Sequence, residues 1–333
     1  MIRAAHLLDD FAMGGVTRFI GCLNRPEFTS LVTSEVHSIS RNAVFAPKLK
    51  ADMILTHVPP SWKRLLLYRS LRHRNPRARL VHVEHSYTRA FERHCVPNPG
   101  RFRRMIRLAL KPFDEVICVS DGQRQWMTET VGLDARKCRT IHPVSGREEL
   151  LSLPPSGPDQ DGPLRLAAYG RYSDVKNYAA LIEAVGRFPR HRVTLALAGS
   201  GPDDADLRIR AAHHDNVTVC GPVENIGEFL AAADAVIVPS RWESFGLVAI
   251  EARLAGRPIL VADVDGLPEQ VGGSGLATPM KTAEEIEAAI ARFAAMPISN
   301  MGMKGREDAR ADIEKSMSEW QALFSRAQAR DGQ

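Results

Sequence analysis

Two glutamates, Glu243 and Glu251, lie in one stretch of the chain, residues 239–252, and the second could bind hydroxyl groups of a ligand. An apolar run at residues 235–238 precedes the stretch, and apolar residues recur at helical spacing behind it, which predicts a strand, a sharp turn and a helix at residues 245–254. Glu243 then falls in the turn. Glu251 falls about two helical turns later, where its carboxylate can accept hydrogen bonds from vicinal hydroxyls such as those of a ribose.

The turn before this helix also offers backbone N–H groups. The first N–H groups of a helix have no partner within the helix and lie at the positive end of its dipole, so they form a ready anion site. The residues expected to carry them are Ser244, Phe245 and Gly246. A less specific interpretation is a polar turn that opens an ordinary core helix. The neighbouring motifs help to decide between a ligand-binding turn and a purely structural one.

Two cations follow a strand expected at residues 164–169. Arg171 and Lys176 come after Gly170, at the end of that strand and just before a helix. A diphosphate placed there would meet both side chains and free backbone N–H groups. The two cations therefore favour a phosphorylated ligand over the less specific interpretation.

Glycines mark two further places where backbone could approach a phosphate. Gly199 and Gly201 follow the next strand of the second half, and Gly14 and Gly15 follow a strand at residues 2–8. Glycine has no Cβ, so its backbone can come close to a ligand. The spacing around Gly14 and Gly15 is not G-x-G-x-x-G, so the sequence does not indicate a dinucleotide fingerprint.

Histidines follow two strands of the first half. His57 and His85 stand at strand ends, on the side where ligands bind to open α/β sheets, although a histidine in such a place is often structural. His82 and His85 should point to opposite faces of a strand, which speaks against a metal site. The pair of aspartates at residues 263 and 265 is interpreted as loop structure, so no metal ligand is assigned.

Strands alternate with helices along the whole chain, which indicates an α/β protein with parallel sheets covered on both sides. A stretch rich in Pro, Ser and Gly at residues 145–162 is expected to link two domains, 1–150 and 151–307, with a ligand in the cleft between them. A last helix, at about residues 308–329, could cross back to the first domain. The strands are expected at residues 2–8, 51–56, 80–84, 116–119, 164–169, 193–198, 217–220, 235–238 and 259–262.

The composition is that of an ordinary soluble protein, since 44% of the 333 residues are apolar and no apolar run is long enough to span a membrane. We expect a cytoplasmic protein, because no secretion signal is evident and the five cysteines are scattered and never form a C-x-x-C pair.

Positive charge is concentrated in the first half. Residues 60–112 contain 14 Lys and Arg, opposed only by Glu84 and Glu92. The apolar stripe of the helix at residues 101–111 either lies in an anionic membrane interface or belongs to the core. The surplus charge suits phosphate-bearing partners or the inner face of the cell membrane, and nothing indicates nucleic acid.

The order of these motifs resembles a known family. The series G-R-x4-K, G-x-G-P, P-S-x2-E-S-F-G-x4-E-A, G-x-P and D-x-x-E, across residues 164–272, resembles the donor domain of the retaining GT-B glycosyltransferases of family 4. The resemblance is looser over residues 1–144, where it is carried by Gly14-Gly15, His85 and Val119-Ser120. It implies a GT-B fold, with two Rossmann-like domains that face a central cleft.

The resemblance implies a role for each matching residue. Arg171 and Lys176 would neutralise the diphosphate of a UDP- or GDP-linked sugar, and Glu251 would hold its ribose. Glu243, with the backbone of residues 244–247, would bind the sugar hydroxyls and the distal phosphate. His85 would face the donor from the first domain, and Gly15 would close over the phosphate.

The same resemblance implies transfer without a metal and with retention of the anomeric configuration. The implied acceptor is a glycan or a lipid-linked glycan of a cell-surface polysaccharide, lipopolysaccharide or glycolipid. Thr17 and His142 depart from the family pattern, and these departures concern acceptor binding and leave the donor site intact. The alternatives are an epimerase or phosphorylase on the same fold, and a silent nucleotide-sugar-binding module.

Overall fold

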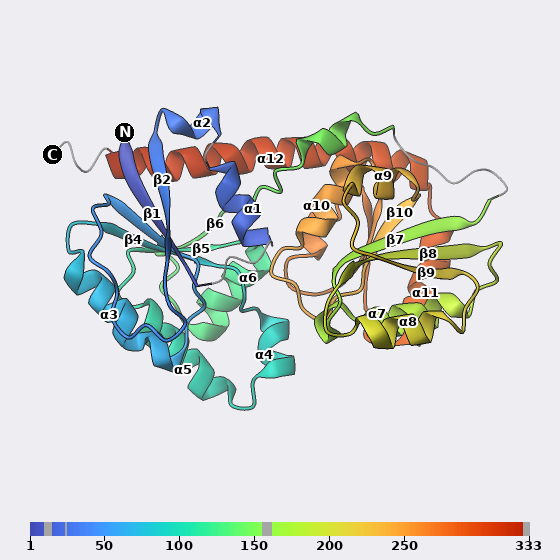
Figure 1. Cartoon of the computed structure of the whole chain (residues 1–333), viewed down its shortest axis with the longest axis horizontal. Coiled ribbons are helices and arrows are strands. Elements are labelled where there is room, and N and C mark those ends of the chain that lie inside the picture. Colours follow the sequence, from blue (N-terminus) through green and yellow to red (C-terminus); the bar gives the residue numbers. More distant parts are fainter. Residues whose placement is uncertain (10–14, 24, 155–161, 329–333) are drawn as a thin grey trace. The chain divides into compact units, whose positions relative to one another are not determined.

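The computed structural model describes residues 1–9, 15–23, 25–154 and 162–328. Contacts divide the chain into two compact units: unit 1 comprises Met1–Gly146 and Ile313–Gln333, and unit 2 comprises Arg147–Asp312. Each unit holds one six-stranded sheet (Figure 1). All the paired strands run parallel, so the α/β class with two parallel sheets flanked by helices is confirmed.

The sheet of unit 1 has the order β2-β1-β3-β4-β5-β6. Its central strands are short apolar runs buried on both faces, as expected of a parallel sheet covered by helices. The two edge strands, β2 and β6, were not predicted, because polar and charged residues interrupt their apolar pattern. The strands are β1 (Ile2–Leu8), β2 (Val32–Ser38), β3 (Met53–Thr56), β4 (Arg79–Glu84), β5 (Glu115–Cys118) and β6 (Cys138–Thr140).

One face of this sheet is covered by α3 (Leu65–Arg74), α5 (Pro99–Leu110) and the π-helical segment η2 (Trp126–Val131), which pack against apolar side chains of the strands. Met105, Ile106 and Ala109 of α5 are at most 3% exposed. The apolar stripe of α5 therefore belongs to the core, and the alternative that it lies in a membrane interface is wrong.

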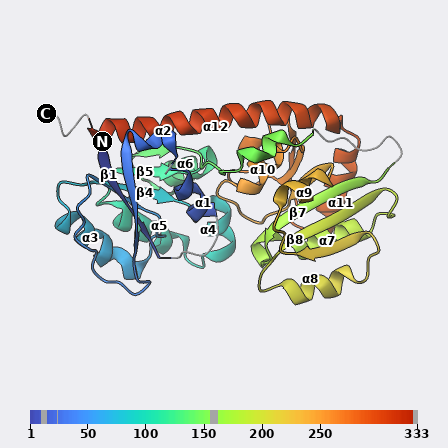
Figure 2. The same cartoon turned by 45° about the horizontal axis from the view of Figure 1, so that its top comes forward.

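The opposite face of the sheet is covered by α1 (Gly15–Cys22), α2 (Pro26–Thr29) and the C-terminal part of the long helix α12 (Ile298–Gln328). The rings of Phe19 and Trp320 lie 4.8 Å apart, and Phe28 meets Phe324 edge to face at 6.1 Å. Figures 1 and 2 show this part of α12 beside α2. The last helix thus completes the core of unit 1.

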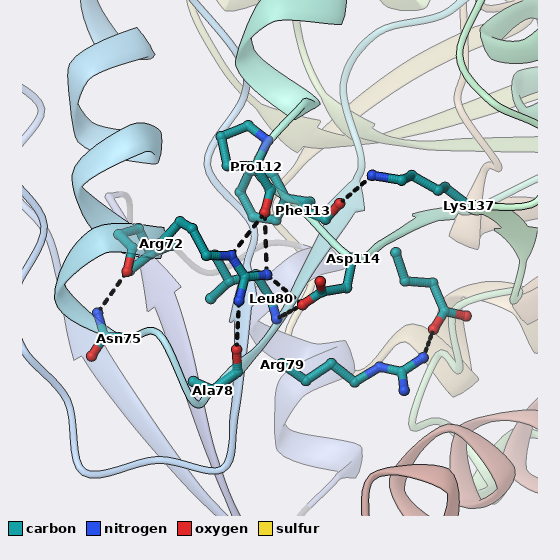
Figure 3. A network of polar contacts seen from close by, with 11 residues as sticks. Arg72, Asn75, Ala78, Arg79, Leu80, Pro112, Phe113, Asp114 and Lys137 are labelled. Atoms are coloured by element: carbon teal, nitrogen blue, oxygen red, sulfur yellow. Dashed lines mark hydrogen bonds and ion pairs between the residues drawn. The ribbon is translucent and has the colours of Figure 1, made fainter. Parts of the chain in front are cut away.

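Helix α3 is fastened at its C-terminal end by Arg72 (Figure 3). The guanidinium donates to the carbonyl oxygens of Pro112 and Ala78 at 3.1–3.2 Å and pairs with Asp114. Asp114 also accepts a hydrogen bond from the backbone N–H of Leu80, at 2.8 Å. Arg72 is therefore a structural residue of the basic segment 60–112, not a surplus surface charge. The other helical segments of unit 1 are η1 (Trp62–Arg64), α4 (Arg89–Cys95) and α6 (Asp121–Gln125).

The sheet of unit 2 has the order β12-β11-β10-β7-β8-β9. Strands β10 and β11 have the bounds expected from their apolar runs, whereas β7 and β8 continue two residues farther than expected, through Arg171 and Ser200. The edge strand β12 was not predicted. The strands are β7 (Leu164–Arg171), β8 (Val193–Ser200), β9 (Val217–Gly221), β10 (Ala235–Val238), β11 (Ile259–Ala262) and β12 (Gly275–Thr278).

The helices of unit 2 form two groups. In one group α7 (Tyr178–Gly186) contacts both α8 (Asp204–Ala211) and α11 (Ala283–Ala294). In the other, α10 (Leu247–Leu254) packs on β10 and β11 near α9 (Ile226–Ala231) (Figure 1). Within the described residues, no helix combines the length and the apolar character that crossing a bilayer requires.

The stretch expected to be a linker is partly ordered in unit 2. It contains the 3-10 helix η3 (Glu148–Ser152), whose Leu150 is 1% exposed. The carbonyl oxygen of Pro154 accepts a hydrogen bond from the buried Arg257, at 2.7 Å. Residues 148–154 are therefore packed on unit 2, and residues 155–161 lie outside the described residues.

Candidate functional site

The turn between β10 and α10 is shaped by Gly246. This residue has a φ of 90°, and a Cβ there would lie 2.6 Å from a methyl carbon of Leu267, so both conformation and space require glycine. Helix α10 begins at Leu247, two residues later than expected. Ser244 and Phe245 therefore belong to the turn, and the N–H groups of Leu247 and Val248 are those at the positive end of the helix.

Side chains from the following loop hold this turn. Gln270, in the 3-10 helix η5 (Pro268–Gln270), donates through Nε2 to the carbonyl oxygens of Phe245 and Gly246, at 2.5 and 3.2 Å. Asp265 accepts a hydrogen bond from the backbone N–H of Glu243 at 3.2 Å. Sequence reasoning missed Gln270, because a single glutamine in a loop has no distinctive pattern. The Asp265 carboxylate thus supports the loop, in line with the structural interpretation of the aspartates at 263 and 265.

Lys176 lies against the turn. It ends the 3-10 helix η4 (Asp174–Lys176), and its Nζ donates to Oε2 of Glu243 in an ion pair whose two side chains are each 18% exposed. Arg241 joins the turn after β10 to the segment after β7, since its backbone N–H donates to the carbonyl oxygen of Val175 at 2.8 Å. The structure thus brings a predicted phosphate-binding cation next to a predicted sugar-binding acid.

Arg171 and Gly170 form the end of β7. Gly170 has a φ of 139°, and a Cβ there would lie 3.4 Å from the Tyr178 hydroxyl and 3.8 Å from Cε of Lys176. Arg171 is exposed, and its guanidinium forms no ion pair with any residue that the structure describes. It therefore remains available to an anion at the same strand end as Lys176.

Glu251 is buried on α10, at 1% exposure. Its Oε2 accepts a hydrogen bond from the Tyr169 hydroxyl at 2.9 Å, and its Oε1 lies 3.6 Å from Nε of Arg147. Both partners come from segments that sequence reasoning assigned to a strand and to a linker. The apolar context of Tyr169 gave no signal that its hydroxyl would meet an acid 82 residues later.

Gly199 and Gly201 have a packing role that the sequence did not reveal. A Cβ on Gly199 would lie 1.9 Å from the carbonyl oxygen of Gly170, and one on Gly201 would lie 2.2 Å from that of Tyr172. Gly199 thus allows β8 to approach the backbone of β7, and Gly201 allows the segment after β8 to approach the residue that follows β7. This close approach between two strands accounts for both glycines without a ligand.

In unit 1, His85 is the outer end of a row of three imidazoles. Its Nε2 lies 3.0 Å from Nδ1 of His57, and Nε2 of His57 lies 3.0 Å from Nδ1 of His6. Burial lowers the pKa of His6 and of His85 to about 4, in the latter case despite the nearby carboxylate of Glu84. Burial, together with the neighbouring histidines, lowers the pKa of His57 well below its usual value. All three rings are therefore neutral near pH 7.

The predicted residues thus fall into two sets. Lys176, Glu243, Gly246 and the N-terminus of α10 form one contiguous group in unit 2, next to Arg171 and Glu251. His85 and Gly15, the first residue of α1, belong to unit 1. Gly14 lies outside the described residues. Cations, oriented N–H groups, the partly buried Glu243 and the buried Glu251 at one strand end can bind a phosphorylated ligand that also carries hydroxyl groups.

Two family models match the chain. The model described as Glycosyltransferase Family 4 matches residues 26–144, and the model described as Glycosyl transferases group 1 matches residues 163–295. Together they cover about three quarters of the sequence. The D-inositol 3-phosphate glycosyltransferase of Mycobacteroides abscessus is 38% identical over 38% of this chain and 30% of that protein. The chain spans less than half the length of the curated relatives that it matches.

Solved structures share the fold over nearly the whole chain. Sucrose-phosphate synthase from Thermosynechococcus elongatus superposes with a TM-score of 0.77 and 22% identity, over 99% of this chain and 100% of that chain. Anabaena Alr3699/HepE, in complex with UDP and glucose, gives a TM-score of 0.75 and 18% identity, over 98% and 100% of the two chains. At these sequence identities, the similarity shows a shared fold.

Proposed function

The chain belongs to the GT-B glycosyltransferases, and we propose that it moves a sugar from a UDP- or GDP-linked donor to a glycan or lipid-linked acceptor. The observation that carries this proposal is the contact between Lys176 and Glu243. It joins the strand end that bears Arg171 to the N-terminus of α10, so that positive charge, backbone N–H groups and a sugar-binding acid occupy one surface of unit 2.

Each residue of the proposed donor site has its own function. Arg171 and Lys176 balance the charge of the diphosphate, and the N–H groups of Leu247 and Val248 bind its distal phosphate. Glu251 accepts hydrogen bonds from the ribose, and Glu243 accepts them from sugar hydroxyls. As the glycosidic bond breaks, negative charge grows on the leaving diphosphate, and preorganised cations and dipoles stabilise it there.

This division of roles supports transfer with retention and without a metal. The leaving phosphate can accept the proton of the acceptor hydroxyl on the face from which it departs, so no separate carboxylate base is required. Two cations and a helix N-terminus supply the charge that a divalent ion would otherwise provide. The proposed site residues therefore need no metal ligand.

For the acceptor, we propose a glycan or lipid-linked glycan at the inner face of the cell membrane, in the synthesis of a surface polysaccharide, lipopolysaccharide or glycolipid. The surplus of positive charge in residues 60–112 supports this location. Arg72, Arg79 and Arg103 of this segment pair with acids. The ring of Trp62 is 41% exposed and lies under the guanidinium of Arg101, at 5.5 Å. An exposed tryptophan among cations suits an anionic lipid surface.

A donor screen tests the activity. The purified protein is incubated with UDP- and GDP-sugars and with glycan, lipid-linked and inositol phosphate acceptors, in the presence of EDTA. We expect donor-dependent transfer, a product whose anomeric configuration by NMR matches the donor, and loss of turnover in Arg171→Ala and Lys176→Ala. Arg210→Ala, on the exposed side of α8, is the matched control. Full turnover in the Arg171 and Lys176 variants would reject the assigned roles.

The same screen separates the alternatives. Release of an epimerised sugar indicates an epimerase, and phosphate-dependent cleavage of a glycan indicates a phosphorylase. Nucleotide binding without transfer or donor hydrolysis indicates a silent binding module. Flotation with vesicles tests the membrane: we expect binding to anionic vesicles at low salt and release at high salt, and equal recovery with neutral vesicles contradicts the proposed location.

A further inference from the structure

A cavity of about 530 Å³ lies within unit 1, between the edge strand β6 and helix α12. Helix α12 contributes Lys315, Glu319, Ala322 and Arg326, whose spacing of four, three and four residues places them on one face of the helix. The rest of the lining comes from α6 and from β6 with the residues that flank it. Because all of these segments belong to unit 1, the cavity is formed by unit 1 alone.

Positive charge prevails in this cavity. Five of its lining side chains are Lys or Arg, and its acidic side chains are Asp121 and Glu319. Arg136 is balanced by Asp134, with 2.9 Å between Nη2 and Oδ2. Lys315 is exposed and forms no ion pair with a residue that the structure describes. The lining therefore keeps a surplus of positive charge.

Arg139 and Arg326 of the lining share one buried acid, Glu115, with a third arginine. Nη2 of Arg79 lies 2.5 Å from Oε2 of this acid, whereas Nε of Arg139 and Nη2 of Arg326 lie 2.6 and 3.7 Å from its Oε1. Burial and the repulsion of Arg139 and Arg79 lower the pKa of Arg326. Its Nε is buried and has no hydrogen-bond partner among the described residues. One carboxylate balances one guanidinium, so two of these three positive charges have no counter-charge here.

The lining favours a small, hydrophilic, phosphorylated ligand. Guanidinium groups bind phosphate oxygens through paired N–H groups, and a bound phosphate would offset the repulsion between them. The carboxylate of Glu319 and the hydroxyl of Thr140 can accept hydrogen bonds from hydroxyl groups of the ligand. No phenyl, phenol or indole ring is among the described residues of the lining, so no such ring stacks on a nucleobase there. The volume is in the range of small-molecule sites.

We propose that this cavity is a second anion site, which binds a phosphorylated sugar or polyol, either free or as the headgroup of a lipid. Arg139, Arg326 and Lys315 bind the phosphate, and Glu319 accepts hydrogen bonds from the hydroxyl groups. This site goes beyond the proposed sugar transfer and does not depend on it, because its residues belong to unit 1 and those of the proposed donor site that bind the diphosphate belong to unit 2.

Calorimetry of the full chain with glucose 6-phosphate and inositol phosphate tests the site, with inorganic phosphate and glucose as partial ligands. We expect the sugar or polyol phosphate to bind more tightly than inorganic phosphate, because only the former also meets Glu319, and we expect glucose alone not to bind. Affinity should fall as salt screens the cations. Equal affinities for inorganic phosphate and for both phosphorylated probes would overturn the assignment to a sugar or polyol.

Variants of the cations locate the binding. Arg326→Gln should weaken binding of the phosphorylated probes about 10-fold, and Lys315→Gln about 3- to 10-fold, since each removes a charged hydrogen-bond donor. Lys48→Gln, at an exposed lysine in a loop of unit 1, should bind them like the wild type. Circular dichroism checks that each variant is folded, and Lys315→Gln, at an exposed position, tests the site even if Arg326→Gln does not fold. Unchanged affinity in folded Lys315→Gln and Arg326→Gln overturns the proposal.

A phosphorylated probe can also occupy the proposed donor site, so Lys176→Ala is the second control. We expect this variant to keep full affinity for glucose 6-phosphate, and Lys315→Gln to keep full affinity for UDP. Loss of probe binding in Lys176→Ala, with none in Lys315→Gln, would assign the probe to the donor site and overturn the proposal.

Flotation distinguishes the two sources of the ligand. Vesicles of phosphatidylcholine with phosphatidylinositol phosphate are compared with vesicles of phosphatidylcholine and phosphatidylserine of equal charge. Preference for the former that is lost in Lys315→Gln supports the site with a lipid headgroup as its ligand. Binding of the free probes without this preference supports the site with a soluble ligand. If neither the free probes nor the vesicles bind in a way that depends on Lys315 or Arg326, the proposal is wrong.

Discussion

Lys176 and Glu243, 67 residues apart in the chain, form an ion pair in which each side chain is 18% exposed. The pair couples two parts of the proposed donor site, because the cation that would meet the diphosphate is already balanced by the acid that would meet the sugar. An incoming diphosphate carries more negative charge than one carboxylate, and it therefore competes with Glu243 for Lys176.

Glu243→Gln tests this competition. Without the carboxylate, Lys176 binds UDP without first leaving an ion pair, so we expect UDP affinity to rise about 3- to 10-fold, the size of a partly exposed pair. We expect kcat with the nucleotide-sugar to fall at least about 10-fold, because the sugar loses a charged acceptor. Calorimetry and turnover measure the two effects.

The control for this prediction is Asp204→Asn, which breaks an exposed ion pair with Arg208 on α8. It should leave both UDP affinity and turnover unchanged. Weaker UDP binding in Glu243→Gln would mean that the carboxylate orients Lys176 for the phosphate instead of competing for it.

Tyr169→Phe tests the buried partner of Glu251. The change removes the hydroxyl that donates to Oε2, which leaves the acid less well held. We expect KM for the donor to rise about 3- to 10-fold, equivalent to the net contribution of one typical hydrogen bond, with kcat nearly unchanged. Steady-state kinetics measure both constants.

Tyr172→Phe is a matched control, since its hydroxyl donates to the carbonyl oxygen of Leu197 at 2.9 Å in the same unit. It should lower thermal stability without raising KM. An equal rise of KM in both variants would show that Tyr169 acts through general stability and not through Glu251.

The residues of the proposed donor site could be predicted from the sequence because they lie close together along the chain. The residues that hold them in place could not. Glu243, Gly246 and Glu251 lie within one strand-turn-helix unit, so local spacing places them. Gln270, Tyr169 and Arg147 reach the site only through the tertiary fold, and none belongs to a local pattern. Gly199 was predicted to let the backbone approach a ligand, and the structure shows in addition that the backbone of β7 leaves no room for a side chain there.

The fold class could be predicted from the alternation of apolar runs along the sequence. The edge strands could not be predicted in this way. Central parallel strands are continuous apolar runs, which the sequence displays directly. Strand β2 (Val32–Ser38) lies at the edge of the sheet beside β1, and polar residues separate its two valines, so it has no continuous apolar run. The stripe of α5 illustrates a further limit: a core-facing stripe and a membrane-facing stripe have the same periodicity, and only the sheet beneath α5 distinguished them.

Gly199→Ala tests the close approach of β7 and β8. Its Cβ would lie 1.9 Å from a backbone oxygen, which no side-chain movement can relieve, so we expect a loss of at least about 3 kcal/mol or failure to fold. Gly21→Ala, in α1, meets no atom within 4 Å and should stabilise the protein by about 0.5–1 kcal/mol. Thermal unfolding compares the two, and equal stabilities would contradict the steric account.

The buried histidines predict an acid-dependent loss of stability. Because the pKa values of His6 and His85 are about 4 when folded, against about 6.5 when unfolded, the unfolded state binds more protons between these values. The free energy of unfolding should therefore fall as pH falls from 6.5 to 4, by up to about 1.4 kcal/mol per pH unit for each histidine. Urea titrations across this range measure the slope, which should be shallower in His57→Asn. A flat profile would contradict the burial of neutral rings.

Arg72→Ala tests the anchor of α3. Its guanidinium donates to the partly buried carbonyl oxygens of Pro112 and Ala78 and pairs with Asp114. We therefore expect a loss of about 1–3 kcal/mol in the free energy of unfolding. Arg74→Ala, on the exposed surface of the same helix, should change it by less than about 0.5 kcal/mol. Similar losses in the two variants would show that the contacts of Arg72 add nothing beyond a surface charge.

Unit 1 cannot complete its core until helix α12 has been synthesised. Trp320 and Phe324, at 1% and 0% exposure, fill the interior of unit 1 from a segment that the ribosome makes after all of unit 2. The first 146 residues therefore emerge as a nascent polypeptide without these two aromatic side chains, whereas Arg147–Asp312 is translated without interruption. Maturation of unit 1 must wait for the codons of α12, and a ribosome stalled before them would display its uncovered apolar surface to chaperones.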